Sequence, residues 1–235
     1  MEYGALTLFP ELFTEFARTS LFGRAIREGY AKLHVENLRE YGLGKHKSVD
    51  DTPYGGGAGM VLRVDCVVAG LEALAARFGG TARRILLSPQ GQPFTQKTAR
   101  RWANEPGLMF VCGRYEGFDE RVRAYVDEEA SLGDFVLTGG EVAAMAMMEA
   151  CVRLIPGVLG NELSAVSESF SDSSDGGLEY PQYTRPLEYR GAAVPEVLRG
   201  GNHGEIERWR QAQARARTEQ RRPDLVGSTG RRSSL

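Results

Sequence analysis

Residues 108–141 constrain the fold of this chain more than any other stretch. The apolar run at residues 108–112 has the length and composition of a buried strand. Two glycine-marked turns follow, at residues 113–117 and 131–140, and the second ends in the pair Gly139-Gly140. In α/β proteins, ligands bind beyond the carboxyl ends of parallel strands. We therefore predict that the two turns form two walls of one ligand pocket.

The rest of the first 155 residues alternates between strand-like and helix-like segments. Apolar or alternating segments at 5–9, 32–38, 84–87 and 108–112 predict strands, the second in an exposed position. Helical spacing or capping signals predict helices at 11–17, 21–28, 61–77, 95–102, 120–126 and 141–154. This alternation predicts an α/β domain with a mainly parallel sheet and helices on both faces.

Composition excludes several classes of protein. The chain is 42% hydrophobic and 26% charged, and no apolar run approaches the length of a membrane span. Its amino terminus lacks the pattern of a signal peptide. The three cysteines are widely spaced in apolar contexts, which is typical of buried thiols in a reducing cytoplasm, and a structural zinc site is not expected.

The charge is distributed unevenly along the chain. Residues 181–235 hold eleven arginines and no lysine against six acidic residues, a net charge of +5, whereas the remaining residues carry −7. An arginine-rich end on an acidic body favours a phosphate-bearing partner, most plausibly nucleic acid. A solvated helix face followed by a basic tail explains the charge alone equally well. Residues 155–186 resemble a linker, 192–199 a helical turn, 204 onward a helix, and 227–235 a disordered end.

The loop at residues 41–59 carries Gly55, Gly56 and Gly57 in a row. Consecutive glycines allow backbone angles closed to other residues and a close approach by a ligand. The loop fits neither a Walker motif nor a dinucleotide fingerprint. A flexible surface loop is the alternative, but long irregular loops in compact domains are more often functional.

Catalytic side chains are few. No serine hydrolase motif occurs, and the strand-end turns at 88–91, 113–117 and 132–140 offer mainly backbone groups, which suit an adenine and a ribose. Arg153 ends the long apolar helix. Glu168, Asp172 and Asp175 lie in the linker, where a carboxylate could close over a substrate as a general base. Taken singly, each carboxylate is more simply explained as a solvated surface charge.

Segments spread along the whole chain resemble those of a known family. The segments TLFPELF, VDDTPYGGGAGM, LSPQG, VCGRYEGFDERV, SLGDFVLTGGE, RLIPGVLG, YTRP, GNHGEIERWR and RRPDL are similar, in order and spacing, to those of the bacterial tRNA (guanine-N1)-methyltransferases. The resemblance covers about residues 6–225. It implies a fold of the SPOUT class, in which the carboxyl-terminal part of the α/β domain forms a trefoil knot, a rare exception to the rule against knots.

The resemblance also implies a domain organisation and partners. A knotted domain would span residues 1–160, a linker 161–186, and a small helical tRNA-binding domain 187–235. The protein would be a cytoplasmic homodimer whose active sites are each completed by the partner, with no membrane association. Its substrate would be tRNA with guanosine immediately 3′ of the anticodon.

The methyl donor implied by the resemblance is S-adenosylmethionine, held largely by backbone. Its contacts would fall on Pro89, Gly91, Gly113, Tyr115, Glu116, Leu132, Gly133, Asp134, Phe135, Val136, Leu137, Gly139 and Gly140. Contacts with the substrate would fall on Asp50, Tyr54, Gly55, Gly56, Arg185 and His203. Carboxylates near the site leave Mg²⁺ open as a further cofactor, although no spacing specifies a ligand set.

In the mechanism of the family, a carboxylate removes the proton of guanine N1 and an arginine stabilises charge developing on O6. Arg153 matches the arginine, and Glu168 occupies the carboxylate position, where aspartate is the expected residue. Because glutamate is longer, and because the linker is also longer after Phe170, Asp172 and Asp175 remain alternatives. Two rival functions remain open: a nucleotide- or RNA-binding protein of this fold without catalysis, and an unrelated α/β enzyme such as an oxidoreductase.

Overall fold

The computed structural model describes residues 1–78, 81–160, 168–171 and 174–226. The chain divides into two compact units, Met1–Gly160 and Asn161–Leu235. The predicted disordered end at residues 227–235 lies outside the described residues, as does Asp172.

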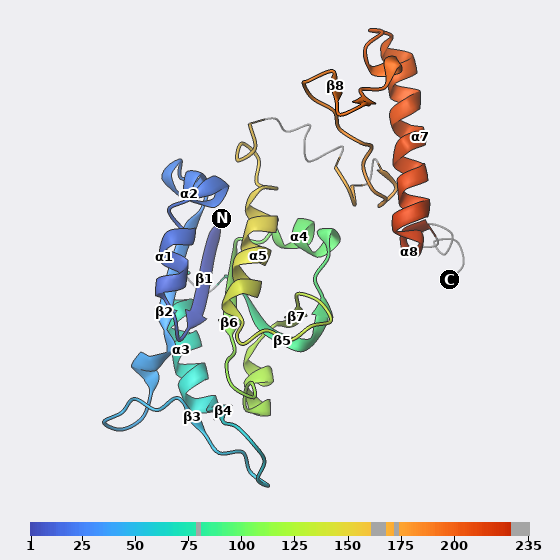
Figure 1. The fold of residues 1–235 in the computed structure, drawn as a ribbon. Coiled ribbons are helices and arrows are strands. Elements are labelled where there is room, and N and C mark those ends of the chain that lie inside the picture. Colours follow the sequence, from blue (N-terminus) through green and yellow to red (C-terminus); the bar gives the residue numbers. More distant parts are fainter. Residues whose placement is uncertain (79–80, 161–167, 172–173, 227–235) are drawn as a thin grey trace, which may run out of the picture. The chain divides into compact units, whose positions relative to one another are not determined.

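The first unit is built on a five-stranded sheet in the order β2-β1-β6-β5-β7, in which every neighbouring pair is parallel (Figure 1). Its strands are β1 (Glu2–Thr7), β2 (Lys32–Asn37), β5 (Arg83–Pro93), β6 (Gly107–Cys112) and β7 (Glu128–Ser131). The prediction of a mainly parallel α/β sheet is confirmed. The strand expected in an exposed position is β2, at one edge of this sheet.

Helices cover both faces because successive strand residues point to opposite sides. On one face, Leu108 and Phe110 of β6 pack in a core with α1 (Glu11–Phe16), α2 (Ser20–Arg27), α4 (Gln96–Trp102) and α5 (Glu141–Val152). On the other face, Met109 and Val111 pack with α3 (Val64–Ala76) and with the 3₁₀ helices η1 (Leu38–Tyr41) and η2 (Glu120–Tyr125). The methionines at 147 and 148 are fully buried core residues of α5.

Local signals explain several boundaries. Thr95 caps α4, its hydroxyl accepting a hydrogen bond from the Thr98 amide at 3.3 Å. Pro10 is the cap of α1 rather than its first helical residue. The helix expected from residue 61 begins at Val64, because Val61–Leu62 forms β4 and pairs antiparallel with β3 (Asp50–Asp51). These two short strands close the glycine-rich loop that separates them.

Near the site, one prediction is wrong and one strand had no predicted bounds. The segment expected to be an amphipathic α-helix at 120–126 is the 3₁₀ helix η2, which buries only Val122 and so lacks an apolar stripe to dock a longer helix. Strand β7 precedes the strand-end turn predicted at 132–140, but no bounds were predicted for it, because its sequence EEAS carries two adjacent glutamates. In the structure both glutamates are paired with arginines, so their charges do not prevent strand formation.

The second unit contains a short hairpin and a long helix. The hairpin joins β8 (Glu188–Tyr189) and β9 (Ala192–Ala193), and the helical turn expected at 192–199 is reduced to the 3₁₀ helix η4 (Glu196–Leu198). Helix α7 (His203–Arg221) follows, with Asn202 accepting hydrogen bonds from the amides of Gly204 and Glu205. The short helix α8 (Pro223–Val226) ends the described chain.

Candidate active site

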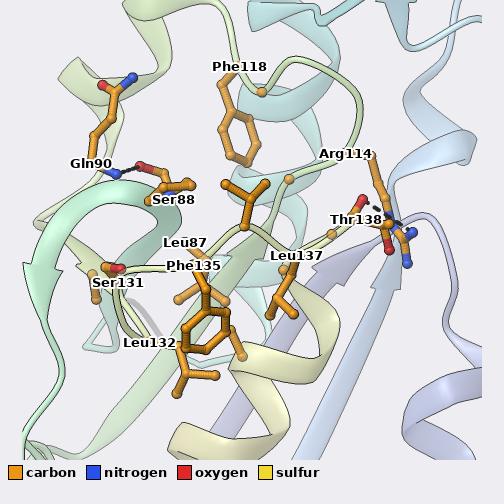
Figure 2. Close-up of a pocket in the computed structure, with 18 of the residues that line it drawn as sticks. Leu87, Ser88, Gln90, Arg114, Phe118, Ser131, Leu132, Phe135, Leu137 and Thr138 are labelled. Carbon is orange, nitrogen blue, oxygen red and sulfur yellow. Dashed lines mark hydrogen bonds between the residues drawn. The ribbon is translucent and has the colours of Figure 1, made fainter.

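A cavity of about 280 Å³ lies at the carboxyl ends of β6 and β7, beside residues 87–90 within β5 (Figure 2). It is lined by residues 87–90, 113–118, 130–133 and 135–140, together with Ala143 of α5. The turns that follow β6 and β7 therefore share one pocket, as the sequence predicted. Five of the lining residues are glycines, which expose their backbone, and the amide of Gly140 donates a hydrogen bond to the carbonyl of Gly113 at 3.0 Å, which ties the two turns together.

Glycine is required where this backbone packs closely. A Cβ added to Gly140 would lie 2.9 Å from the Cα of Cys112, and one added to Gly113 would lie 2.7 Å from the Phe118 ring. Tyr115 and Gly117 both have positive φ angles, of 59° and 102°. The turn after β6 is thus held in a conformation that few residues adopt.

Most of the residues expected to contact the cofactor lie in the cavity lining. These are Pro89, Gly113, Tyr115, Glu116, Leu132, Gly133, Phe135, Val136, Leu137, Gly139 and Gly140. Gly91 and Asp134 do not line it. A Cβ on Gly91 would lie 2.4 Å from the backbone of Ala130, so this glycine allows β5 to pass close to β7.

Several other lining residues were not among the expected cofactor contacts, although most lie in the turns predicted to form the pocket. They are Leu87, Ser88, Gln90, Arg114, Gly117, Phe118, Ala130, Ser131, Thr138 and Ala143. Most flank the residues that were chosen within the same turns, so the available signal was the position of the turns at strand ends. The position of a turn at a strand end does not indicate which of its side chains point into the cavity.

Arg114 is held beside the cavity by a buried carboxylate. Its Nη2 lies 2.9 Å from Oε2 of Glu141, whose side chain is 1% exposed, and the Thr7 hydroxyl donates to Oε1 of the same carboxylate at 2.8 Å. The guanidinium also stacks 4.3 Å above the ring centroid of Phe9 and donates to the Thr138 carbonyl at 3.4 Å (Figure 2). Glu141 is the first residue of α5, where the helix dipole favours a negative charge.

Replacing Glu141 by alanine is expected to lower the free energy of unfolding by about 3–5 kcal/mol, because it leaves a partly buried guanidinium without its carboxylate. Chemical denaturation measures this loss. The matched control is Glu15→Ala, since Glu15 is 75% exposed and pairs with an exposed arginine, Arg18. The control should change stability by less than about 1 kcal/mol. Equal losses in the two variants would contradict the assignment.

A second carboxylate lies behind the β5 wall of the cavity. Burial acts to raise the pKa of Glu129, but hydrogen bonds from Arg123 and Ser88 outweigh it, so the pKa lies below its ordinary value and the group is ionised at neutral pH. By contrast, burial raises the pKa of the Cys112 thiol well above its usual range. Cys112 at the end of β6 therefore stays a protonated thiol and is not a nucleophile.

The expected catalytic residues do not line the cavity. Arg153 is the half-buried C-cap residue of α5 in the first unit. Glu168 belongs to the second unit and is half-exposed, whereas the alternative base Asp175 is exposed and has a φ angle of 49°. The other alternative, Asp172, lies outside the described residues.

The glycine-rich loop is attached to the cavity wall. The amide of Leu62 donates to the carbonyl of Gly117 at 2.9 Å, and the amide of Glu116 donates to the carbonyl of Met60 at 3.0 Å. In that loop Asp50 is half-buried in β3, Tyr54 is fully exposed, and Gly55 and Gly56 have positive φ angles. The other two residues expected to bind substrate, Arg185 and His203, are exposed in the second unit.

The described residues give no support for a metal site. Among them, no group of three or more histidine, cysteine or acidic side chains could hold a metal ion, and Mg²⁺ is not proposed. Within the same part of the chain, no helix is both long and apolar enough to cross a membrane.

Comparison with known proteins points to one family. Residues 1–228 match the family described as tRNA (guanine-1)-methyltransferase TrmD. A protein of Sorangium cellulosum named tRNA (guanine-N(1)-)-methyltransferase is 58% identical, with 96% of this chain and 93% of the relative covered. Proteins of the same name from Syntrophotalea carbinolica and Deinococcus radiodurans are 53% and 51% identical, with 96% and 98% of this chain and 90% and 81% of the relatives covered.

Proposed function

The chain belongs to the tRNA (guanine-1)-methyltransferase family, so it is an enzyme that methylates N1 of guanine in tRNA, and we propose that its cavity binds S-adenosylmethionine. The target is the guanosine immediately 3′ of the anticodon. The observation that carries the proposal is the cavity between residues 87–90 of β5 and the turns after β6 and β7, whose glycine-marked walls bring backbone donors and acceptors close together.

The cavity fits this cofactor in size and in the chemistry of its walls. Its volume of about 280 Å³ is near the lower end of small-molecule sites, about 300–1,000 Å³. Leu87, Leu132 and Phe135 give an apolar surface for the adenine ring, while the backbone of 113–117 offers polar groups (Figure 2). When bound, the donor supplies a methyl group on a positively charged sulfur, next to which the Glu116 carboxylate would be favourable.

The reacting nitrogen must first lose a proton, because N1 of guanine is protonated and a poor nucleophile at neutral pH. We assign Glu168 as the general base that removes this proton. The negative charge then spreads to O6, where the Arg153 guanidinium stabilises it. Held by the turns at 113–117 and 132–137, the donor would supply an electrophilic methyl carbon to the N1 lone pair. The proton ends on the Glu168 carboxylate.

The second unit would bind tRNA. Helix α7 exposes Arg208, Arg215 and Arg221, and such guanidinium groups suit phosphates, which position a nucleic acid without reading its sequence. Arg185 and His203 lie in the same unit and would join this contact. The target guanosine would leave its stack to enter the site, with Asp50 and the loop at 54–56 holding the base. With tRNA as substrate, the cytoplasm is the proposed location.

The protein would act as a homodimer, with each active site completed by the partner's second unit. Support comes from the cavity rim, where Phe135 is 54% exposed and Val136 is 83% exposed. Apolar side chains gathered in this way favour burial against another chain. We also propose the trefoil knot of the SPOUT class in the first unit. It is supported by the path after β7, which returns across the sheet so that Gly139 pairs with Arg114 beyond β6.

A direct assay tests the proposed function. Purified protein is incubated with S-adenosylmethionine carrying a labelled methyl group and with unmodified tRNA that has guanosine 3′ of the anticodon. We expect labelled N1-methylguanosine at that position, and none in a matched tRNA carrying adenosine there. Calorimetry with S-adenosylmethionine alone tests donor binding separately. If the donor binds but no N1-methylguanosine forms, the noncatalytic RNA-binding alternative is favoured.

A further inference from the structure

One segment of the cavity wall interrupts the pairing between strands β5 and β7. Strand β5 pairs with β7 up to Leu87, and pairing resumes at Gln92, yet both residues lie opposite Ala130. The four residues between them, 88–91, therefore bulge out of the ladder between β5 and β7. Three of the four, Ser88, Pro89 and Gln90, line the cavity. Because ladder pairing with β7 skips this bulge, its position depends on other contacts.

Side chains make those contacts. The Ser88 hydroxyl donates a hydrogen bond to Oε1 of Glu129 at 2.5 Å. It accepts a hydrogen bond from the Gln90 amide at 2.9 Å, which Figure 2 shows. The Gln90 side-chain oxygen accepts a hydrogen bond from Nη2 of Arg123 at 2.9 Å. Both polar side chains of the bulge are thus connected to Glu129 or Arg123.

Glu129 and Arg123 also bind each other through two hydrogen bonds. Arg123 donates from Nε to Oε2 of Glu129 at 2.9 Å and from Nη2 to Oε1 at 3.0 Å. The two side chains are 21% and 26% exposed. A bidentate contact of this kind fixes the relative orientation of the two side chains as well as their distance. Neither residue lines the cavity, and their side chains reach its wall through Ser88 and Gln90 of the bulge.

We propose that Glu129 and Arg123 are positioning residues for donor binding: they hold the bulge at Ser88 and Gln90 in the shape that the methyl donor requires. This inference rests on the proposed function, because it assumes that the cavity binds S-adenosylmethionine. The pair does not touch the reacting atoms. Its loss should therefore weaken donor binding while leaving the chemical step largely intact.

The test is Glu129→Gln in the full-length protein, which keeps the size of the side chain and removes its charge. A hydrogen bond to a charged group contributes enough that its loss should raise the dissociation constant for S-adenosylmethionine about tenfold, as measured by calorimetry. The KM for the donor should rise by the same factor. The kcat at saturating donor and tRNA should stay within about threefold of the wild-type value.

The neighbouring residue supplies a matched control. Glu128 precedes Glu129 on β7 and points to the opposite face, where it accepts hydrogen bonds from Arg101 at 2.5 and 2.9 Å and from the Trp102 indole at 3.2 Å. Its side chain is 19% exposed, close to the value for Glu129. Glu128→Gln should lower thermal stability and leave the donor dissociation constant unchanged. If it weakened donor binding as much as Glu129→Gln, the effect would be general destabilisation and the inference would be wrong.

Two further measurements extend the test, and the first of them does not require Glu129→Gln to fold. Arg123→Lys keeps the charge but loses the bidentate contact, so donor affinity should fall by a smaller factor. A double-mutant cycle with Ser88→Ala should show that Glu129→Gln has little further effect once the Ser88 hydroxyl is gone. Donor affinity unchanged in both Glu129→Gln and Arg123→Lys would overturn the inference. Failure of the wild-type protein to bind the donor would instead refute the proposed function.

Discussion

Replacing Glu168 by glutamine is expected to lower the kcat of tRNA methylation by about 10²–10⁴-fold, the usual contribution of a general base. The amide is nearly the same size as the carboxylate but cannot take up the N1 proton of guanine. The backbone around it should be unaffected, because the Glu168 carbonyl accepts from the Ser171 amide at 3.2 Å and the Phe170 amide donates to the Gly177 carbonyl at 2.7 Å. Single-turnover methylation with saturating donor and tRNA measures the effect.

The controls for this prediction address the identity of the base. Asp175→Asn and Asp172→Asn should retain nearly full kcat, and all three variants should bind S-adenosylmethionine like the wild-type protein. Glu168→Asp should retain substantial activity, because aspartate is the residue expected here from the family pattern. Near-normal turnover in Glu168→Gln, combined with a loss in one of the aspartate variants, would move the base to that aspartate.

Replacing Arg153 by alanine is expected to lower kcat by about 10²–10³-fold, the effect of removing one donor to a developing oxyanion. The charge on O6 grows only as N1 loses its proton, so the guanidinium acts mainly on the transition state. The donor dissociation constant should not change, because Arg153 lies at the end of α5 and does not line the cavity. Rapid-quench kinetics together with calorimetry separate these two quantities.

Arg153→Lys is the matched variant, since it keeps the positive charge without the planar pair of donors. Its kcat should fall between those of the wild-type protein and Arg153→Ala. A loss of donor binding in Arg153→Ala, with kcat preserved at saturating donor, would show that the residue shapes the cavity rather than the chemistry.

Much of the first unit was predictable because its signals are local. The apolar run at 108–112 has the composition of a strand buried on both faces, and β6 is the central strand of the sheet. Thr95 marked the start of α4 through its own hydroxyl. One boundary failed because it depends on strand pairing: Val61 joined β4 rather than α3 because Asp51 lies opposite it.

The candidate site likewise combines features that local sequence predicts with features that only the folded chain determines. Turns at strand ends located the pocket, since parallel strands bring their carboxyl ends to one edge of the sheet. The local pattern gave no sign that Glu129 and Arg123 would meet behind the bulge at Ser88, or that Glu141 would be buried against Thr7 and Arg114. Thr7 and Glu141 are 134 residues apart in the chain, so only the folded sheet brings them together.

The sequence by itself determined the class of fold, the pocket-forming turns and, through its resemblance to a family, the reaction. Those features follow from strand and helix periodicity, from glycine placement and from short motifs, all of which act over a few residues. Only the tertiary structure decided which charged side chains pair. The depressed pKa of Glu129, the burial of Glu141 and the bulge between Leu87 and Gln92 all depend on strands packed side by side. Burial and pairing are properties of neighbours in space, and neighbours in space are set by the whole fold.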